Sequence, residues 1–421
     1  MSVTTDLFNA IQHTALIDTH EHVRDEAKAY ERTWSLFDFF DHYVSSDLVS
    51  AGMPREHLER MRHTANDLSL EARWALLRPY WPHARTTGYG RAMLAYMRDL
   101  FDVDDINDDT WQTLCQRIAV QCQPGWYETV LHDRENIETA LVITWPGEGV
   151  DVDRRYFRAV PILDHFAIPG TRADLEKLED ETDQSIQTLD QLMDAQEARL
   201  DAFDRTGIAA VKIFLAYRRT LAFDRVGKGE AARVFDRIWL SQTQDLSFED
   251  LKPLQDFMTR RLFALATERG LPIQVHTGLQ EGNGNYIANS NPTLLANVLM
   301  EFGDARFDLF HGGWPYTGEL ASLAKNFANV HANLCWVPVI SPYAFKQTLH
   351  TWIETIPANK IFAVGGDSNY IEGAYGHCKL ARQLVHDVLA AKVAEGYFTE
   401  TEAISYAQRV LRDNALDFYR F

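Results

Sequence analysis

The sequence has few of the features that mark several large classes of protein. Its four cysteines, Cys115, Cys122, Cys335 and Cys378, form neither a CxxC pair nor a zinc-finger spacing, so we expect reduced thiols. No apolar run reaches the roughly 18 residues of a membrane span. The first ten residues also lack the apolar core of a signal peptide. We therefore expect a soluble, cytoplasmic protein.

Positive charge is scarce relative to negative charge. The chain of 421 residues carries 41 Lys and Arg against 60 Asp and Glu, a formal net charge of −19. Nucleic acids and anionic membranes are bound through basic patches. We therefore expect neither as a partner and expect a small-molecule substrate instead, bound by a homo-oligomer.

Short apolar runs at wide spacing dominate the pattern along the chain. They cover residues 15–18, 139–144, 159–163, 209–214, 272–276, 307–311, 330–334 and 361–364. Nearly continuous apolar runs are typical of parallel strands buried on both faces, and helical patterns separate most of these. A Gly-rich phosphate loop, which an open nucleotide-binding sheet would carry, is absent from the sequence. We predict an α/β fold, a (β/α)8 TIM barrel.

Two long segments interrupt this alternation. An insertion after the carboxyl end of a barrel strand projects over the barrel mouth. We therefore predict a helical cap over the active site at residues 23–138 and a barrel built from residues 1–22 and 139–421. A shorter insertion, 218–245, follows the fourth strand on the same face. Five cap residues are expected to line the pocket: Trp74, Arg78, Trp81, His83 and Arg85.

Polar side chains that suit a metal follow the predicted strands. His20 and His22 flank Glu21, and at an extended strand end residues i and i+2 point to the same side. Later strands end in three further candidates, His276, His311 and Asp367. Imidazoles with a carboxylate suit a divalent transition metal. The alternatives are hydrogen-bonded core histidines and, for Asp367, a helix N-cap.

Lys212 lies inside the apolar run 209–214. A lysine ammonium is costly to bury unless it is paired or neutralised. Two interpretations stay open. Lys212 is a snorkelling or salt-bridged structural residue, or it stands beside metals in a neutral or chemically modified form.

The order of these residues resembles the amidohydrolase superfamily of metal-dependent (β/α)8 hydrolases. The segments 275–278, 310–316 and 366–368 are similar to the branch that includes the amidohydrolase-like domain fused to glutamine synthetase. That branch neighbours uronate isomerases and metal-dependent decarboxylases. The decarboxylases usually carry ExH where this chain has His20, and uronate isomerases generally lack the lysine that is Lys212 here.

The resemblance implies a ligand set of six residues: His20, His22, Lys212, His276, His311 and Asp367. His20, His22 and Asp367 would bind one metal, and carboxylated Lys212 would bridge it to a second. Zinc is the expected ion, with manganese or iron as alternatives, at one or two ions per chain. The metal would activate a water, with Asp367 and His311 as the catalytic residues.

The expected substrate is a small amide, less readily an ester, that carries a carboxylate or an aromatic group. Its expected binding residues are Tyr217, Arg218, Trp314 and His377. The guanidinium would hold a carboxylate through two hydrogen bonds. Two alternatives to C–N hydrolysis remain: a lyase or isomerase of the decarboxylase or uronate isomerase type, and a non-catalytic metal-binding barrel. Two metals per chain favour the hydrolase, and one favours the lyase or isomerase.

Overall fold

The computed structural model describes residues 3–62, 68–240 and 246–421. The parts of the predicted amino-terminal, cap and second-insertion segments that fall on 1–2, 63–67 and 241–245 lie outside the described residues. The described chain contains eight strands: β1 Leu16–Glu21, β2 Ile137–Thr144, β3 Phe157–Pro161, β4 Val211–Ile213, β5 Ile273–Val275, β6 Phe307–Leu309, β7 Val330–Asn333 and β8 Ile361–Phe362.

The strands pair in chain order, and every pair is parallel. They form one sheet of three strands, β1-β2-β3, and one of five, β4-β5-β6-β7-β8. Backbone hydrogen bonds join the two sheets at both seams. Ala209 N donates to Ala159 O at 2.9 Å on one side, and Asp367 N donates to His20 O at 2.8 Å on the other. The predicted (β/α)8 TIM barrel is confirmed.

Helices cover the outside of the strands, which are buried on both faces, as the apolar runs predicted. Around the barrel these are α1 Val3–His13, α9 Asp164–Ala167, α10 Arg172–Thr182, α11 Leu189–Asp204, α12 Lys228–Leu240, α13 Phe248–Glu268, α14 Ala296–Glu301, α15 Thr317–Asn326, α16 Val337–Ile340 and α17 Pro342–Thr355. Short turns η3 Leu215–Tyr217, η4 Ile287–Ser290, η5 Pro292–Leu295, η6 His311–Gly313 and η7 Ala358–Lys360 connect them. Among the described residues, no helix has the length and apolar character needed to cross a bilayer.

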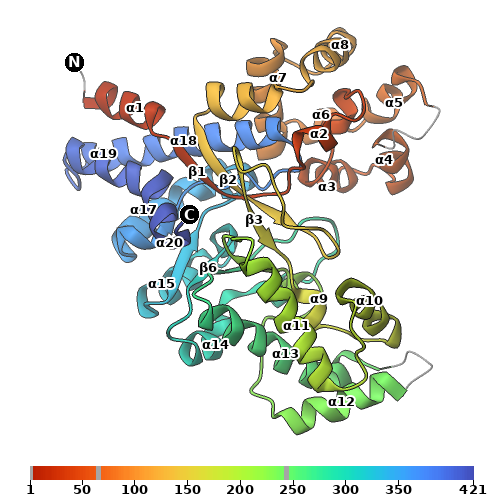
Figure 1. The fold of residues 1–421 in the computed structure, drawn as a ribbon. Helices are drawn as coiled ribbons and strands as arrows, with labels where there is room; N and C mark the ends of the chain where they lie inside the picture. Colours follow the sequence, from red (N-terminus) through yellow and green to blue (C-terminus); the bar gives the residue numbers. More distant parts are fainter. Residues whose placement is uncertain (1–2, 63–67, 241–245) are drawn as a thin grey trace.

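The segment between β1 and β2 is helical. It holds α2 Glu26–Ala29, η1 Leu36–Phe39, α3 Tyr43–Ser50, α4 Arg55–Arg62, α5 Leu70–Leu77, α6 Trp81–Ala84, α7 Gly88–Phe101, α8 Trp111–Gln121 and the π-helix η2 Glu128–Arg134. These helices lie together on one side of the strands, opposite the group α10 to α13 (Figure 1). Phe37, Phe39 and Phe40 in and beside η1 are fully buried and give the segment an apolar centre.

The chain after β8 is helical. It forms α18 Ile371–Ala394, α19 Glu400–Gln408, the π-helix η8 Arg409–Asp413 and α20 Asn414–Tyr419. The last helix seals the inside of the barrel. The Tyr419 hydroxyl donates to the fully buried Asp308 of β6, and the Phe418 ring lies 4.3 Å from the His331 ring of β7.

Candidate metal centre

Three of the predicted ligands meet where β1 and β8 adjoin. Asp367 Oδ1 lies 3.3 Å from His20 Nε2 and 3.0 Å from His22 Nε2. One ligand atom from each residue falls within 4.8 Å of the other two. The backbone hydrogen bond from Asp367 N to His20 O holds the two chain segments in this register. The structure therefore brings His20, His22 and Asp367 together.

The donor atoms fit a divalent ion. His20 Nε2 and Asp367 Oδ1 are buried and make no hydrogen bond within the described chain, although they face each other. A buried polar atom without a partner costs about 1–3 kcal/mol. Two atoms that each lie about 2.0–2.2 Å from one zinc ion are themselves about 3 Å apart. An ion shared by these atoms accounts for both their spacing and their missing partners.

Burial sets the protonation states that such an ion requires. It lowers the pKa of His20 well below its ordinary value, and the charge of Lys212 adds to the effect. Burial alone would raise the pKa of Asp367, but its imidazole neighbours, His20 first, bring that pKa well below the usual range. These shifts favour a neutral His20 imidazole and an ionised Asp367 carboxylate, the forms that bind metals.

His276 and His311 form a hydrogen-bonded pair beside these ligands. His276 Nε2 lies 2.9 Å from Leu279 O, and since a carbonyl only accepts, this nitrogen carries the proton. His276 Nδ1 then accepts from His311 Nε2 at 2.9 Å. His311 Nδ1 lies 3.3 Å from Cys335 O and 3.8 Å from Asp367 Oδ2. Both nitrogens of His276 are engaged, so in this arrangement it orients His311.

Cys335, which the sequence did not single out as a ligand, belongs to this side of the site. It follows β7, and its thiol sulfur lies within 4.8 Å of ligand atoms of His311 and Asp367. Burial raises the pKa of the Cys335 thiol well above its ordinary value. The structure thus groups His311 with Cys335 and Asp367, whereas the predicted second set was His276, His311 and Lys212.

Lys212 points into the barrel with no polar partner. It is fully buried, and its Nζ makes no hydrogen bond or ion pair with any described residue. The nitrogen lies 3.6 Å from the centre of the Phe310 ring, which in turn lies 5.0 Å from the His20 ring. Burial lowers the pKa of Lys212 to about 8. The salt-bridged interpretation of Lys212 is therefore wrong for the described chain.

The helical segment after β1 contributes two residues that sequence reasoning missed. The Tyr43 hydroxyl donates to Asp367 Oδ2 at 2.5 Å, and the His42 ring lies 5.5 Å from the His22 ring. Trp336, which follows β7, stacks on Tyr43 with ring centres 3.8 Å apart. No strand end marks His42 or Tyr43, so the sequence offered no signal for them.

Strained backbone gathers at the same place. His42, His311, Trp336 and Asp367 have φ values of 56°, 62°, 70° and 55°. Residues with a side chain rarely adopt positive φ, least of all bulky ones. Such strain costs of order 1–3 kcal/mol per residue and concentrates at functional sites. Four such residues therefore meet at the candidate metal centre.

Two buried carboxyl groups tie β1 to the loop after β8. Asp18 Oδ1 accepts from the backbone N of His20 and of Gly366, both at 3.1 Å. Glu21 Oε2 accepts from Ser368 N at 2.7 Å. Burial, together with the neighbouring Asp18, raises the pKa of Glu21 well above its ordinary value. Glu21 thus supports the ligand loops and does not face the site.

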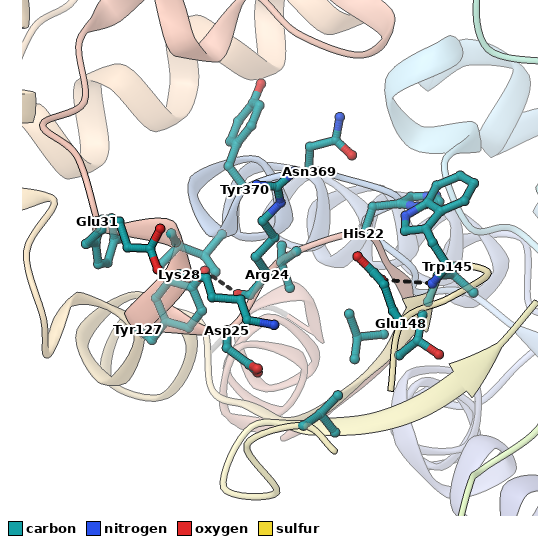
Figure 2. A pocket seen from close by; sticks show the side chains of 18 of the residues that line it. His22, Arg24, Asp25, Lys28, Glu31, Tyr127, Trp145, Glu148, Asn369 and Tyr370 are labelled. Atoms are coloured by element: carbon teal, nitrogen blue, oxygen red, sulfur yellow. Dashed lines mark hydrogen bonds between the residues drawn. The ribbon is translucent and has the colours of Figure 1, made fainter. Parts of the chain in front are cut away.

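A pocket of about 1170 Å³ opens beside His22. Its walls come from the chain after β1, the loop after β2 and the loop after β8, and include Arg24, Lys28, Tyr127, Trp145, Glu148, Asn369 and Tyr370 (Figure 2). The Trp145 ring stacks on the His22 ring with centres 5.7 Å apart. Polar and charged groups dominate this lining, which suits a small hydrophilic substrate.

The four residues predicted to bind substrate, Tyr217, Arg218, Trp314 and His377, do not line the pocket beside His22. Tyr217 accepts from Glu281 N at 3.0 Å and packs on His276. His377 lies beside Asp367, but its Nδ1 is 2.5 Å from Gly366 O. Arg218 is exposed, and Trp314 is partly buried. The 3-10 turn η3, which starts two residues after β4, sends the chain away from this pocket.

The five predicted pocket residues of the helical segment also lie away from it. Trp74 and Trp81 are buried inside the segment, Arg85 pairs with Asp105 at 2.6 Å, and none of the five lines the pocket beside His22. Tyr43 and Arg24 reach the site from this part of the chain instead. That residues 23–138 act as a separate capping unit stays a prediction.

Comparisons with known proteins agree with this geometry. The model of the Amidohydrolase family matches residues 242–421, which contain His276, His311 and Asp367. This match covers the carboxyl-terminal part of the chain, less than half of its length, and shows a likeness to that family. Protein fluG of Emericella nidulans is 28% identical to this chain over 174 residues, which are 40% of the chain and 20% of fluG. The chain thus spans about a fifth of that relative's length.

Solved structures share the fold over nearly the whole chain. The uronate isomerase of Thermotoga maritima superposes with a TM-score of 0.81 at 16% identity, covering 99% of this chain and 97% of the isomerase. The glucuronate isomerase of Caulobacter crescentus gives 0.80 at 18%, with coverages of 99% and 94%. A candidate metal-dependent hydrolase of Lactobacillus casei gives 0.67 at 18%, with 98% and 97%. The likeness therefore includes the helical segment between β1 and β2.

Proposed function

We propose that this chain hydrolyses a C–N bond of a small carboxylate-bearing substrate, with His20, His22 and Asp367 holding a divalent metal. The observation that carries the proposal is Lys212, a fully buried amine without a polar partner beside these ligands. Carboxylation would give it a negative charge and two oxygens that ligate metals, which removes the cost of an isolated buried cation. A pKa of about 8 keeps part of the amine neutral near neutral pH, the form that reacts with carbon dioxide.

The residues of the chain divide the chemistry among them. His20, His22 and Asp367 would hold the metal, which would supply a Lewis acid for the scissile carbonyl and lower the pKa of a bound water. Asp367, ionised at neutral pH, takes the proton of the attacking water and passes it to the leaving nitrogen. The Tyr43 hydroxyl donates to Asp367 Oδ2 and holds the carboxylate in place. His276 Nδ1 lies 2.9 Å from His311 Nε2 and holds the His311 ring beside Asp367.

An isomerase of sugar acids is the second candidate. Two specific observations favour it: the similarity to two isomerases extends over 99% of the chain, and the pocket beside His22 is lined mainly by polar groups. An isomerase needs a base that moves a proton between neighbouring carbons, and Asp367 with Tyr43 could serve. An isomerase reaction gives the unpartnered Lys212 no catalytic or metal-binding role. We therefore rank the isomerase second.

Metal content and the state of Lys212 test the proposal together. We expect zinc-loaded protein, purified with bicarbonate, to hydrolyse N-acyl amino acids and to show a carbamate resonance after exchange with ¹³C-bicarbonate. Lys212→Ala should lose the resonance and the activity, and short carboxylates should restore part of the activity. Interconversion of uronate and ketouronate, with one metal per chain and no carbamate, would establish the isomerase instead.

A further inference from the structure

The pocket beside His22 contains two cations that no described residue neutralises. Of the three basic residues in its lining, Arg32 pairs with Asp38 at 2.7 Å. The side chains of Arg24 and Lys28 are exposed and make no hydrogen bond or ion pair with the described chain. Free cations inside a pocket are available to a ligand.

Arg24 is held in place relative to the metal ligands. It stands two residues beyond His22, whose backbone N donates to Ser368 O at 2.9 Å. The Tyr127 hydroxyl donates to Arg24 O at 2.7 Å. These two hydrogen bonds anchor the main chain on both sides of Val23 and leave the guanidinium free. Figure 2 shows Arg24 in the middle of the pocket, between Lys28 and the His22–Trp145 end.

Most carboxylates of the lining already have partners. Glu148 accepts from Trp145 N, Asp41 pairs with Arg62, and Glu372 accepts from Trp126 Nε1 at 2.8 Å. Glu31, which is exposed, lies beside Lys28 at the far end of the pocket from His22 (Figure 2). Of the two free cations, Arg24 is the one nearer His22 (Figure 2).

We propose that Arg24 binds a carboxylate of the substrate while the reacting group lies at His22 and Asp367. The inference rests on the proposed function and adds a substrate class: elongated molecules with a carboxylate several bonds from the scissile carbonyl. An extended chain advances about 3.3 Å per residue, so the Arg24 backbone lies some 6–7 Å beyond that of His22. A guanidinium binds a carboxylate through two parallel hydrogen bonds, which fixes the orientation of the substrate. Arg24 thus takes the role that the sequence assigned to Arg218.

Dicarboxylates of increasing length measure this spacing without catalysis. Zinc-loaded protein is titrated calorimetrically with malonate, succinate, glutarate and adipate, each beside the monocarboxylate of the same carbon number. We expect the longer diacids to bind about tenfold more tightly than their monoacids, as one added charge-assisted contact would give. Arg24→Gln should remove that advantage and leave monocarboxylate binding unchanged. Lys28→Gln, in the same pocket, and Arg218→Gln, outside the pocket, should still bind the longer diacids more tightly than the monoacids.

The outcomes separate this inference from the proposed function. Equal diacid binding by the wild type and Arg24→Gln overturns it, and so does a loss caused by Lys28→Gln alone. Because the titration needs no turnover, the inference can hold even if no C–N bond is cleaved. If N-acyl amino acids are substrates, Arg24→Gln should raise KM for them about tenfold and leave their carboxamide analogues unaffected.

Discussion

At the scale of single residues, the site is defined by polar atoms that lack partners. His20 Nε2, Asp367 Oδ1 and Lys212 Nζ are buried and form no hydrogen bonds within the described chain. Native proteins rarely leave such atoms unsatisfied, and the exceptions commonly mark bound ions or catalytic groups. The three atoms belong to β1, β4 and the loop after β8. Folding therefore brings three buried polar atoms without hydrogen bonds to the same end of the barrel.

Lys212→Met should stabilise the metal-free protein. Below pH 8 the folded chain holds an ammonium whose pKa burial has lowered from 10.5 to about 8, and a pKa difference of 1 corresponds to about 1.36 kcal/mol. Methionine keeps the volume of the side chain and removes the charge. We expect the free energy of unfolding at pH 7, measured with urea in bicarbonate-free buffer, to rise by roughly 1–3 kcal/mol. A fall of that size would mean that Lys212 has a stabilising partner.

Tyr43→Phe should reduce catalysis and keep the metal. The substitution removes the hydroxyl that donates to Asp367 Oδ2 at 2.5 Å and leaves the stacking on Trp336 in place. We expect kcat/KM to fall at least tenfold, because Asp367 loses the hydrogen bond that orients it. Metal content, measured by mass spectrometry, should stay the same. Tyr89→Phe is the control, since the buried Tyr89 hydroxyl has no hydrogen-bond partner among the described residues.

At the scale of elements, the strands could be predicted from the sequence. The packing of the insertion after β1 against the ligand residues could not. A run such as 272–276 predicts a buried strand from its composition alone, and His276 at its end is then placed by the barrel geometry. The same reasoning placed His20, His22 and Asp367. Tyr43 starts a helix within a long insertion, and its contact with Asp367 depends on how that insertion packs. Local sequence carries no record of such packing.

The junction of β1 with the loop after β8 tolerates no added side chain. A Cβ on Gly366 would lie 1.8 Å from Glu21 Oε1, a buried atom that cannot move away freely. Gly366→Ala should therefore lower the free energy of unfolding by roughly 1–3 kcal/mol and weaken metal binding. Gly303→Ala is the matched control, because a Cβ there meets no atom within 4 Å. Chemical denaturation and zinc titration measure both effects. Equal behaviour of the two variants would show that Glu21 does not fix the ligand loop.

At the scale of the whole molecule, the barrel has two ends with different tasks. The ligands gather at the carboxyl ends of the strands, while α20 closes the inside through Tyr419 and Asp308. His331 of β7 lies among the Phe362 and Phe418 rings on that closed side. The apolar surroundings, together with the charges of Lys360 and Arg306, lower the pKa of His331 to about 3. This partly buried histidine links the stability of the barrel to pH at a distance from the metal ligands.

His331→Gln should flatten the acid dependence of stability. Between pH 6.5 and about 3 the unfolded chain binds a proton at His331 that the folded chain does not bind. The free energy of unfolding of the wild type therefore falls as pH decreases through this window, by up to about 1.4 kcal/mol per pH unit for one histidine. Above pH 6.5 both states hold a neutral imidazole, and the contribution vanishes.

We measure the free energy of unfolding by urea denaturation from pH 7 to pH 4. Its slope against pH should be smaller by up to that amount in His331→Gln. The same substitution at the exposed His13, which water solvates in both states, should leave the slope as it is. Parallel slopes for the wild type and His331→Gln would mean that His331 is solvated in the folded barrel, contrary to its packing between the two phenylalanine rings.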